Sequence, residues 1–194
     1  MYVVINLLYD TYPKDKYVNI NFMFKSGDLP IVAIAYAQGG NIIYGLKSIL
    51  DFYNKNGLIA LKNEIIGVTM HEFTHIYQYA RFSNKIFVEA VAEYVRISSG
   101  FISGWSGERG SLSPIFNMGY GSIPAYFLLN TDQKYPGFIK MLNLNFNSSS
   151  DTNIVARTIT GDKHQTIDSI WLEYQRGLMN GEMTKIPIYL SYNI

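Results

Sequence analysis

The run His71-Glu72-Phe73-Thr74-His75 constrains this chain more than any other feature. Residues i and i+4 lie on one face of a helix, so both imidazoles can reach a single ion if the run is helical. Glu72 then lies at the rim of that ion, where its carboxylate could take a proton from a metal-bound water. The run predicts a zinc-dependent hydrolase, most simply a peptidase. The alternative is two ordinary helix histidines, one of them buried and hydrogen-bonded, beside a solvated Glu72.

Composition narrows the class of protein further. The chain has 194 residues, of which 48% are hydrophobic and 16% charged, so we expect one domain, residues 1–194, with a sizeable core. The net charge of +1, without basic runs, argues against a nucleic-acid partner. The absence of cysteine excludes disulfides and cysteine-ligated zinc.

No apolar stretch approaches the roughly 18 residues of a membrane span. The first ten residues lack the basic start and the cleavage site of a signal peptide. We therefore expect either a chain that stays inside the cell or one whose leader is removed before residue 1.

The order of periodic segments predicts an α+β fold, with a sheet packed on the metal-binding helix and further helices following. Expected strands cover residues 2–8, 18–24, 31–36 and 42–44, with a strand or docked arm at 186–190. A helix or wide loop is expected at 47–53, closed by the turn at 54–57. Expected helices cover 60–81, which contains the histidines, and 86–99, 123–129, 137–144 and 166–178. Residues 101–117 and 143–153 are expected to be loops.

A catalytic zinc needs three protein ligands and an open fourth position. We interpret His164, in a loop-like segment, as a surface residue. Glu89, on the helix after the next turn, is the better donor, because two helices of opposite direction with a rise of 1.5 Å per residue could bring it beside the histidines. Glu93 lies one turn further along the same face. It could accept from the far nitrogen of a ligating histidine, or it could itself be the third ligand.

Peptide hydrolysis also needs a donor for the oxyanion that develops in the transition state. Tyr120 is a candidate, because glycines on both sides would let the backbone present its hydroxyl. The chain has 16 tyrosines, so this choice rests on its local context alone.

Four stretches carry a resemblance to a known family. They are residues 64–78 around the histidines, 87–96 around Glu89, 119–128 beginning at Gly119, and 166–174 around Trp171. In this order they resemble the plant basic secretory protein family, zincin-type peptidases that also occur in fungi and bacteria. The resemblance covers about residues 32–176, and residues 184–194 have no counterpart.

The resemblance implies a zincin-like domain in which two histidines and a glutamate bind zinc. Its second-helix stretch maps the third ligand onto Glu89, and the glycine-flanked tyrosine maps onto Tyr120. In zincins an edge strand pairs with the extended substrate, and residues 42–44 precede the metal helix in a suitable place. Two features depart from the family. Glu93 stands where the family usually has Asp, and this chain is near neutral, whereas the plant members are basic and secreted.

Together these observations predict a metallopeptidase with one Zn²⁺ and a peptide or protein substrate. The expected ligands are His71, His75 and Glu89, with Glu72 as general base, Tyr120 at the oxyanion, and Glu93 and Gln78 supporting the ligands. Two rival functions remain. One is a catalytically silent metal-binding or defence-type interaction protein of the same fold. The other is a carbohydrate-binding module, suggested by the tyrosines and Trp105.

Overall fold

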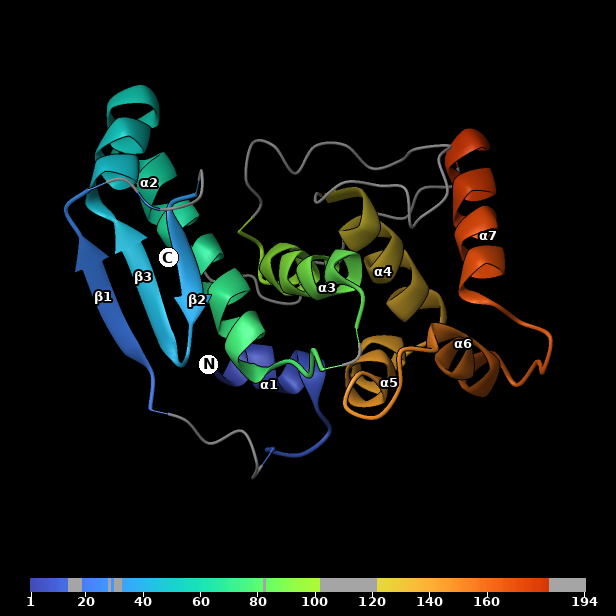
Figure 1. Cartoon of the computed structure of the whole chain (residues 1–194). Coiled ribbons are helices and arrows are strands. Elements are labelled where there is room, and N and C mark those ends of the chain that lie inside the picture. Colours follow the sequence, from blue (N-terminus) through green and yellow to red (C-terminus); the bar gives the residue numbers. More distant parts are fainter. Residues whose placement is uncertain (14–18, 28, 30–32, 82, 102–121, 182–194) are drawn as a thin grey trace.

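The computed structural model describes residues 1–13, 19–27, 29, 33–81, 83–101 and 122–181. Within these ranges the elements follow in the order α1 (Tyr2–Leu8), β1 (Asn21–Lys25), β2 (Ala35–Gln38), β3 (Asn41–Gly45), α2 (Leu46–Tyr77), α3 (Lys85–Ser98), α4 (Ser122–Lys134), α5 (Phe138–Asn145), α6 (Thr152–Thr160) and α7 (Ile167–Met179). The long helix α2 lies between the sheet and the other helices (Figure 1). The predicted α+β class, with a sheet packed on the helix of the histidines, is confirmed.

The sheet is mixed, with strand order β1-β3-β2. β1 runs parallel to β3, with Phe22 opposite Ile42, and β2 runs antiparallel to β3, with Ala37 opposite Ile42. Gly39 and Gly40 connect β2 to β3 with positive φ angles of 55° and 80°, which suits a tight hairpin turn. The strand at residues 42–44 was expected at an edge. This was wrong, because β3 is paired on both sides, and among the described strands β2 lies at an edge instead.

Two hydrophobic clusters meet at α2. The smaller one joins α2 to the sheet through buried residues such as Ile42, Tyr44 and Val68. The larger one is built around α3, whose residues from Ala90 to Ser98 are all buried. Phe73 and Ile76 of α2 pack against both clusters. The histidine-bearing part of α2 is therefore held from two sides.

Several helices match the predicted ranges within one or two residues, among them α3, α5 and α7. Asn84 caps α3 by accepting from the backbone N–H of Ile86 at 2.9 Å. α2 begins earlier than predicted and continues through the expected turn, with a kink at Gly57 (φ 81°, ψ 175°). It also ends at Tyr77, before the predicted Arg81, and Gln78 is already extended.

Two predictions of local structure were wrong. Residues 2–8 form the helix α1 rather than a strand, because Val4, Ile5 and Leu8 pack on one helical face into the larger cluster. Tertiary burial here overrides the strand preference of Val and Ile. α6 was missed altogether. It begins after Asp151, whose carboxylate accepts from the N–H of Asn153 at 2.9 Å, directly after the polar loop.

Asn143 ties three segments together and gives a first prediction. Its side chain, 1% exposed, accepts from the N–H of Tyr79 at 2.8 Å and donates to the carbonyl of Leu8 at 3.2 Å. Asn143→Ala would remove the bond that its side chain makes to each backbone group, so we expect the free energy of unfolding to fall by about 2–4 kcal/mol. Urea denaturation would measure this loss. Exposed Asn56→Ala, which removes a bond to Phe52, is the matched control and should change little.

Candidate metal site

Helices α2 and α3 bring three side chains to one point. His71 and His75 are one turn apart on α2, and Glu89 lies on α3. The two Nε2 atoms of the histidines are 3.0 Å apart. Glu89 Oε2 is 3.3 Å from Nε2 of His71 and 3.6 Å from Nε2 of His75. The three side chains form a group that could hold a metal ion.

The spacing of these atoms suits a tetrahedral zinc site. Ligands at about 2.0–2.1 Å from a tetrahedrally coordinated Zn²⁺ lie about 3.3–3.4 Å from one another. The observed separations of 3.0, 3.3 and 3.6 Å lie on both sides of that value. The side chains of His71 and His75 are 17% and 18% exposed, and that of Glu89 is 37% exposed. The group is thus reachable from solvent.

Each imidazole is also held at its other nitrogen. Nδ1 of His71 lies 3.2 Å from Oε2 of Glu93, which accepts from it. Nδ1 of His75 lies 2.8 Å from the side-chain amide of Gln78. A proton on Nδ1 leaves the Nε2 lone pair free for a metal, and a half-turn of the Gln78 amide presents its oxygen to that proton. Glu93 and Gln78 thus contact the nitrogens that face away from the three-residue group, and their support of a metal ligand stays a prediction.

The charges at this point stabilise one another in the metal-free protein. Burial alone would lower the pKa of His71, but hydrogen bonds to Glu89 and Glu93 outweigh it and raise the pKa to about 9. Burial would raise the pKa of Glu89, but hydrogen bonds to His71 and His75 hold that pKa well below its usual range. Without a metal, a protonated His71 and an ionised Glu89 stabilise the fold together.

These shifts predict how the metal-free protein responds to pH. His71 has a higher pKa when folded, so its contribution to stability is complete below pH 6.5 and is lost as the pH rises to about 9. We therefore expect the urea midpoint, measured with a chelator present, to fall across this range. His71→Asn should flatten the decline. A wild-type midpoint that stays constant between these pH values would contradict the expected coupling.

Glu72 lies against the sheet rather than in open solvent. The residue is 7% exposed. Burial raises the pKa of its carboxyl, while the charges of His71 and His75 and a hydrogen bond from the backbone of Ala37 partly offset this shift. Because Ala37 belongs to β2, the bond joins the histidine helix to the edge of the sheet. The solvated Glu72 of the alternative interpretation does not agree with this burial.

Three further residues were named from the sequence, namely Tyr120, Trp105 and His164. Tyr120 and Trp105 fall outside the described residues, as do residues 184–194. His164 is exposed in the turn before α7. Sequence reasoning missed the backbone group of Ala37, which no side-chain pattern reveals. It also missed an ion pair between Glu64 and Arg96, although both charged residues interrupt apolar helix faces seven positions from His71 and Glu89.

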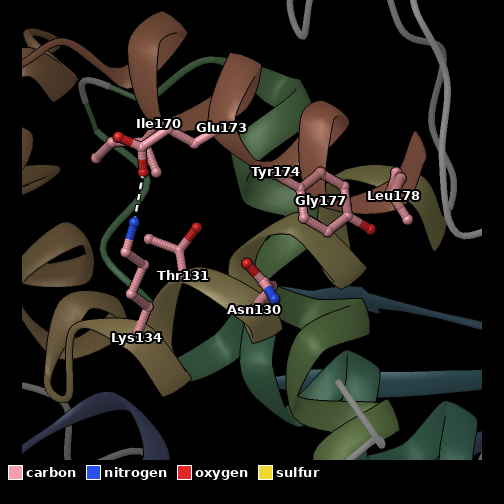
Figure 2. A pocket seen from close by; sticks show the side chains of 8 residues that line it. All are labelled: Asn130, Thr131, Lys134, Ile170, Glu173, Tyr174, Gly177 and Leu178. Carbon is pink, nitrogen blue, oxygen red and sulfur yellow. Dashed lines mark hydrogen bonds and ion pairs between the residues drawn. The ribbon is translucent and has the colours of Figure 1, made fainter. Parts of the chain in front are cut away.

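A separate pocket of about 250 Å³ lies between α4 and α7 (Figure 2). Lys134 donates to Glu173 at one end of it, and Tyr174 and Leu178 lie toward the other end. None of its lining residues belongs to the group of His71, His75 and Glu89, here called the histidine group, so the two are distinct features. Among the described helices, none is long and apolar enough to cross a membrane.

Comparison with known proteins identifies the family. The model of the BSP family, described as "Peptidase of plants and bacteria", matches residues 2–174. Neither the comparison with curated proteins nor that with solved structures returned a match. The matched range includes His71, His75 and Glu89, and it extends the predicted resemblance almost to the N-terminus. The chain therefore belongs to the BSP family of peptidases of plants and bacteria.

Proposed function

We propose that this protein is a zinc metallopeptidase with a zincin-like site. His71, His75 and Glu89 are the ligands of one Zn²⁺, and the substrate is a peptide or protein. The observation that carries the proposal is the convergence of two Nε2 atoms and one carboxylate oxygen at 3.0–3.6 Å, next to a buried glutamate. Membership of a peptidase family supports the substrate class.

The residues divide the chemistry among them. A bound Zn²⁺ supplies a Lewis acid that polarises a carbonyl and eases the deprotonation of water. Glu72 accepts the proton of the attacking water and passes it to the leaving amine. Its place next to His71 on α2 supports this role, because a general base must lie within reach of the proton that it takes. Tyr120 is proposed to donate to the oxyanion, as the sequence predicted.

The edge of the sheet is the proposed place for the substrate backbone. In the described part of the chain, β2 is paired with β3 on one side only. The hydrogen bond from Ala37 to Glu72 brings β2 next to the proposed general base. An extended peptide that adds to β2 would therefore run past the histidine group. This assigns to β2 the role that the sequence had given to residues 42–44.

Metal analysis tests the proposal most directly. We expect protein purified without added zinc to contain about one equivalent of zinc, and His75→Ala to contain almost none. A chelator should abolish cleavage of a broad peptide panel, and zinc should restore it. Less than about half an equivalent of tightly bound metal in the wild type would contradict the ligand assignment. Full zinc content without cleavage of any peptide would favour the catalytically silent metal-binding protein.

A further inference from the structure

A buried ion pair links the same two helices at a distance from the histidines. Nη2 of Arg96, on α3, donates to Oε2 of Glu64, on α2, at 2.7 Å. The two side chains are only 3% and 10% exposed. Nε of Arg96 also donates to the carbonyl of Phe101 at 3.0 Å. One guanidinium thus joins α2, α3 and the chain that leaves α3.

The contacts between α2 and α3 lie along one face of each helix. On α3, Glu89, Glu93 and Arg96 lie four and three residues apart, which places them on one helical face. Their partners on α2 run in the opposite order. Glu89 meets His75, Glu93 meets His71, and Arg96 meets Glu64. The ion pair therefore belongs to the same row of contacts as the metal group.

Gly67 lets the helices approach closely at the ion pair. A Cβ at this position would lie 2.9 Å from Nε of Arg96 and 2.9 Å from the carbonyl oxygen of Phe101. Such distances require the neighbouring atoms to shift. Both atoms belong to the hydrogen bond between Arg96 and Phe101, so the glycine keeps room for this bond.

The energetics of a buried ion pair favour a role in fixing how the two helices align, rather than a role in stabilising the fold. Removing two charges from water is costly, and apolar replacement of a buried ion pair is often neutral or stabilising. The best-attested role of buried polar groups is to fix how helices align. A shift of α3 by one residue would move Glu89 by 1.5 Å along the helix axis and rotate it by about 100°. The metal group could not tolerate that change.

We propose that Glu64 and Arg96 are positioning residues, which set the alignment of α3 on α2 and so hold Glu89 and Glu93 opposite His75 and His71. The consequence for zinc affinity rests on the proposed function. The alignment itself does not, because the hydrogen bond between His71 and Glu93 reports it in the metal-free protein.

The test uses the full chain with the double substitution Glu64→Leu and Arg96→Met, which keeps the helix contact apolar. We expect this variant to unfold at a temperature close to that of the wild type. The ring ¹⁵N and ¹H signals of His71, recorded with a chelator, should lose the signature of the bond to Glu93. The dissociation constant for zinc should rise by about 10–100-fold, as for other groups that orient metal ligands.

Tyr94→Phe is the matched control on the same helix. It removes a 2.8 Å hydrogen bond to Asp132 and leaves the ion pair intact. We expect a lower unfolding temperature, with the His71 signals and the zinc affinity unchanged. A folded double variant with wild-type His71 signals and wild-type zinc affinity would overturn the proposal.

A second variant covers the case in which the double variant does not fold. Arg96→Lys keeps the charge beside Glu64 but removes the Nε–H that bonds to Phe101 and the planar fork of the guanidinium. We expect altered His71 signals, and unaltered ones in this folded variant would overturn the proposal. If the wild type takes up no zinc, the proposed function fails, and the His71 signals alone decide the question of alignment.

Discussion

Glu72→Gln is expected to reduce kcat for peptide hydrolysis by about 10²–10⁴-fold while the protein still binds one equivalent of zinc. The amide has nearly the shape of the carboxylate, so it can still accept the hydrogen bond from Ala37. It cannot accept a proton at neutral pH. Steady-state kinetics on a cleaved peptide, with zinc content measured on the same sample, would check both parts of this expectation.

The matched control for this variant is Glu173→Gln on α7. Glu173 is an exposed carboxylate paired with Lys134, and it lies in the pocket that is separate from the histidine group. We expect its kcat and zinc content to equal those of the wild type. If Glu72→Gln retains wild-type kcat with zinc bound, Glu72 is not the general base, and the proposed mechanism is wrong even though the ligand set stands.

Glu89→Ala is expected to weaken zinc binding by more than about 100-fold, beyond the 10–100-fold usual for groups that only support a ligand. The variant removes a carboxylate oxygen that lies 3.3 Å from Nε2 of His71 and 3.6 Å from Nε2 of His75. Glu93→Ala should fall within the 10–100-fold range, because Glu93 contacts the Nδ1 atom of His71 on the far side of the ring. Competition with a chromophoric chelator would give both affinities.

The two variants are controls for each other. Each variant removes one glutamate carboxylate, and the two glutamates lie one turn apart on the same face of α3. General damage to the helix should therefore affect both variants alike. If Glu93→Ala abolished zinc binding and Glu89→Ala did not, Glu93 would be the third ligand. The sequence left this alternative open, and the order of the two affinities decides it.

The histidine helix and its neighbour could be predicted because their signals are local and periodic. The spacing of His71 and His75 requires a helix, and the helix rise was enough to bring Glu89 to them. The sequence suggested that Glu93 could contact the far nitrogen of a histidine, and Glu93 lies 3.2 Å from Nδ1 of His71. For Gln78 no contact was predicted from the sequence, and the structure has it 2.8 Å from Nδ1 of His75. These inferences needed only distances along the chain and one turn.

The other features depend on contacts that lie far apart in the sequence. α1 has the composition of a strand, and only its packing against distant helices makes it helical. β3 lies at the centre of the sheet because a strand pairs with it on each side. Patterns of apolar residues predict strands but do not predict their pairing. The bond from Ala37 to Glu72 uses a backbone N–H, and every residue type except proline carries one.

The position of α2 between two hydrophobic clusters has a consequence for engineering this protein. Phe73 and Ile76 lie within two residues of His75 in the sequence, and each packs against both clusters. Close-packed interiors transmit strain. A substitution that opens a cavity in either cluster would therefore strain the packing of Phe73 and Ile76. A search for variants with altered activity should therefore sample both clusters. Substitutions at residues outside the ligand set, such as truncation of Ile42, belong in such a library alongside those next to His71, His75 and Glu89.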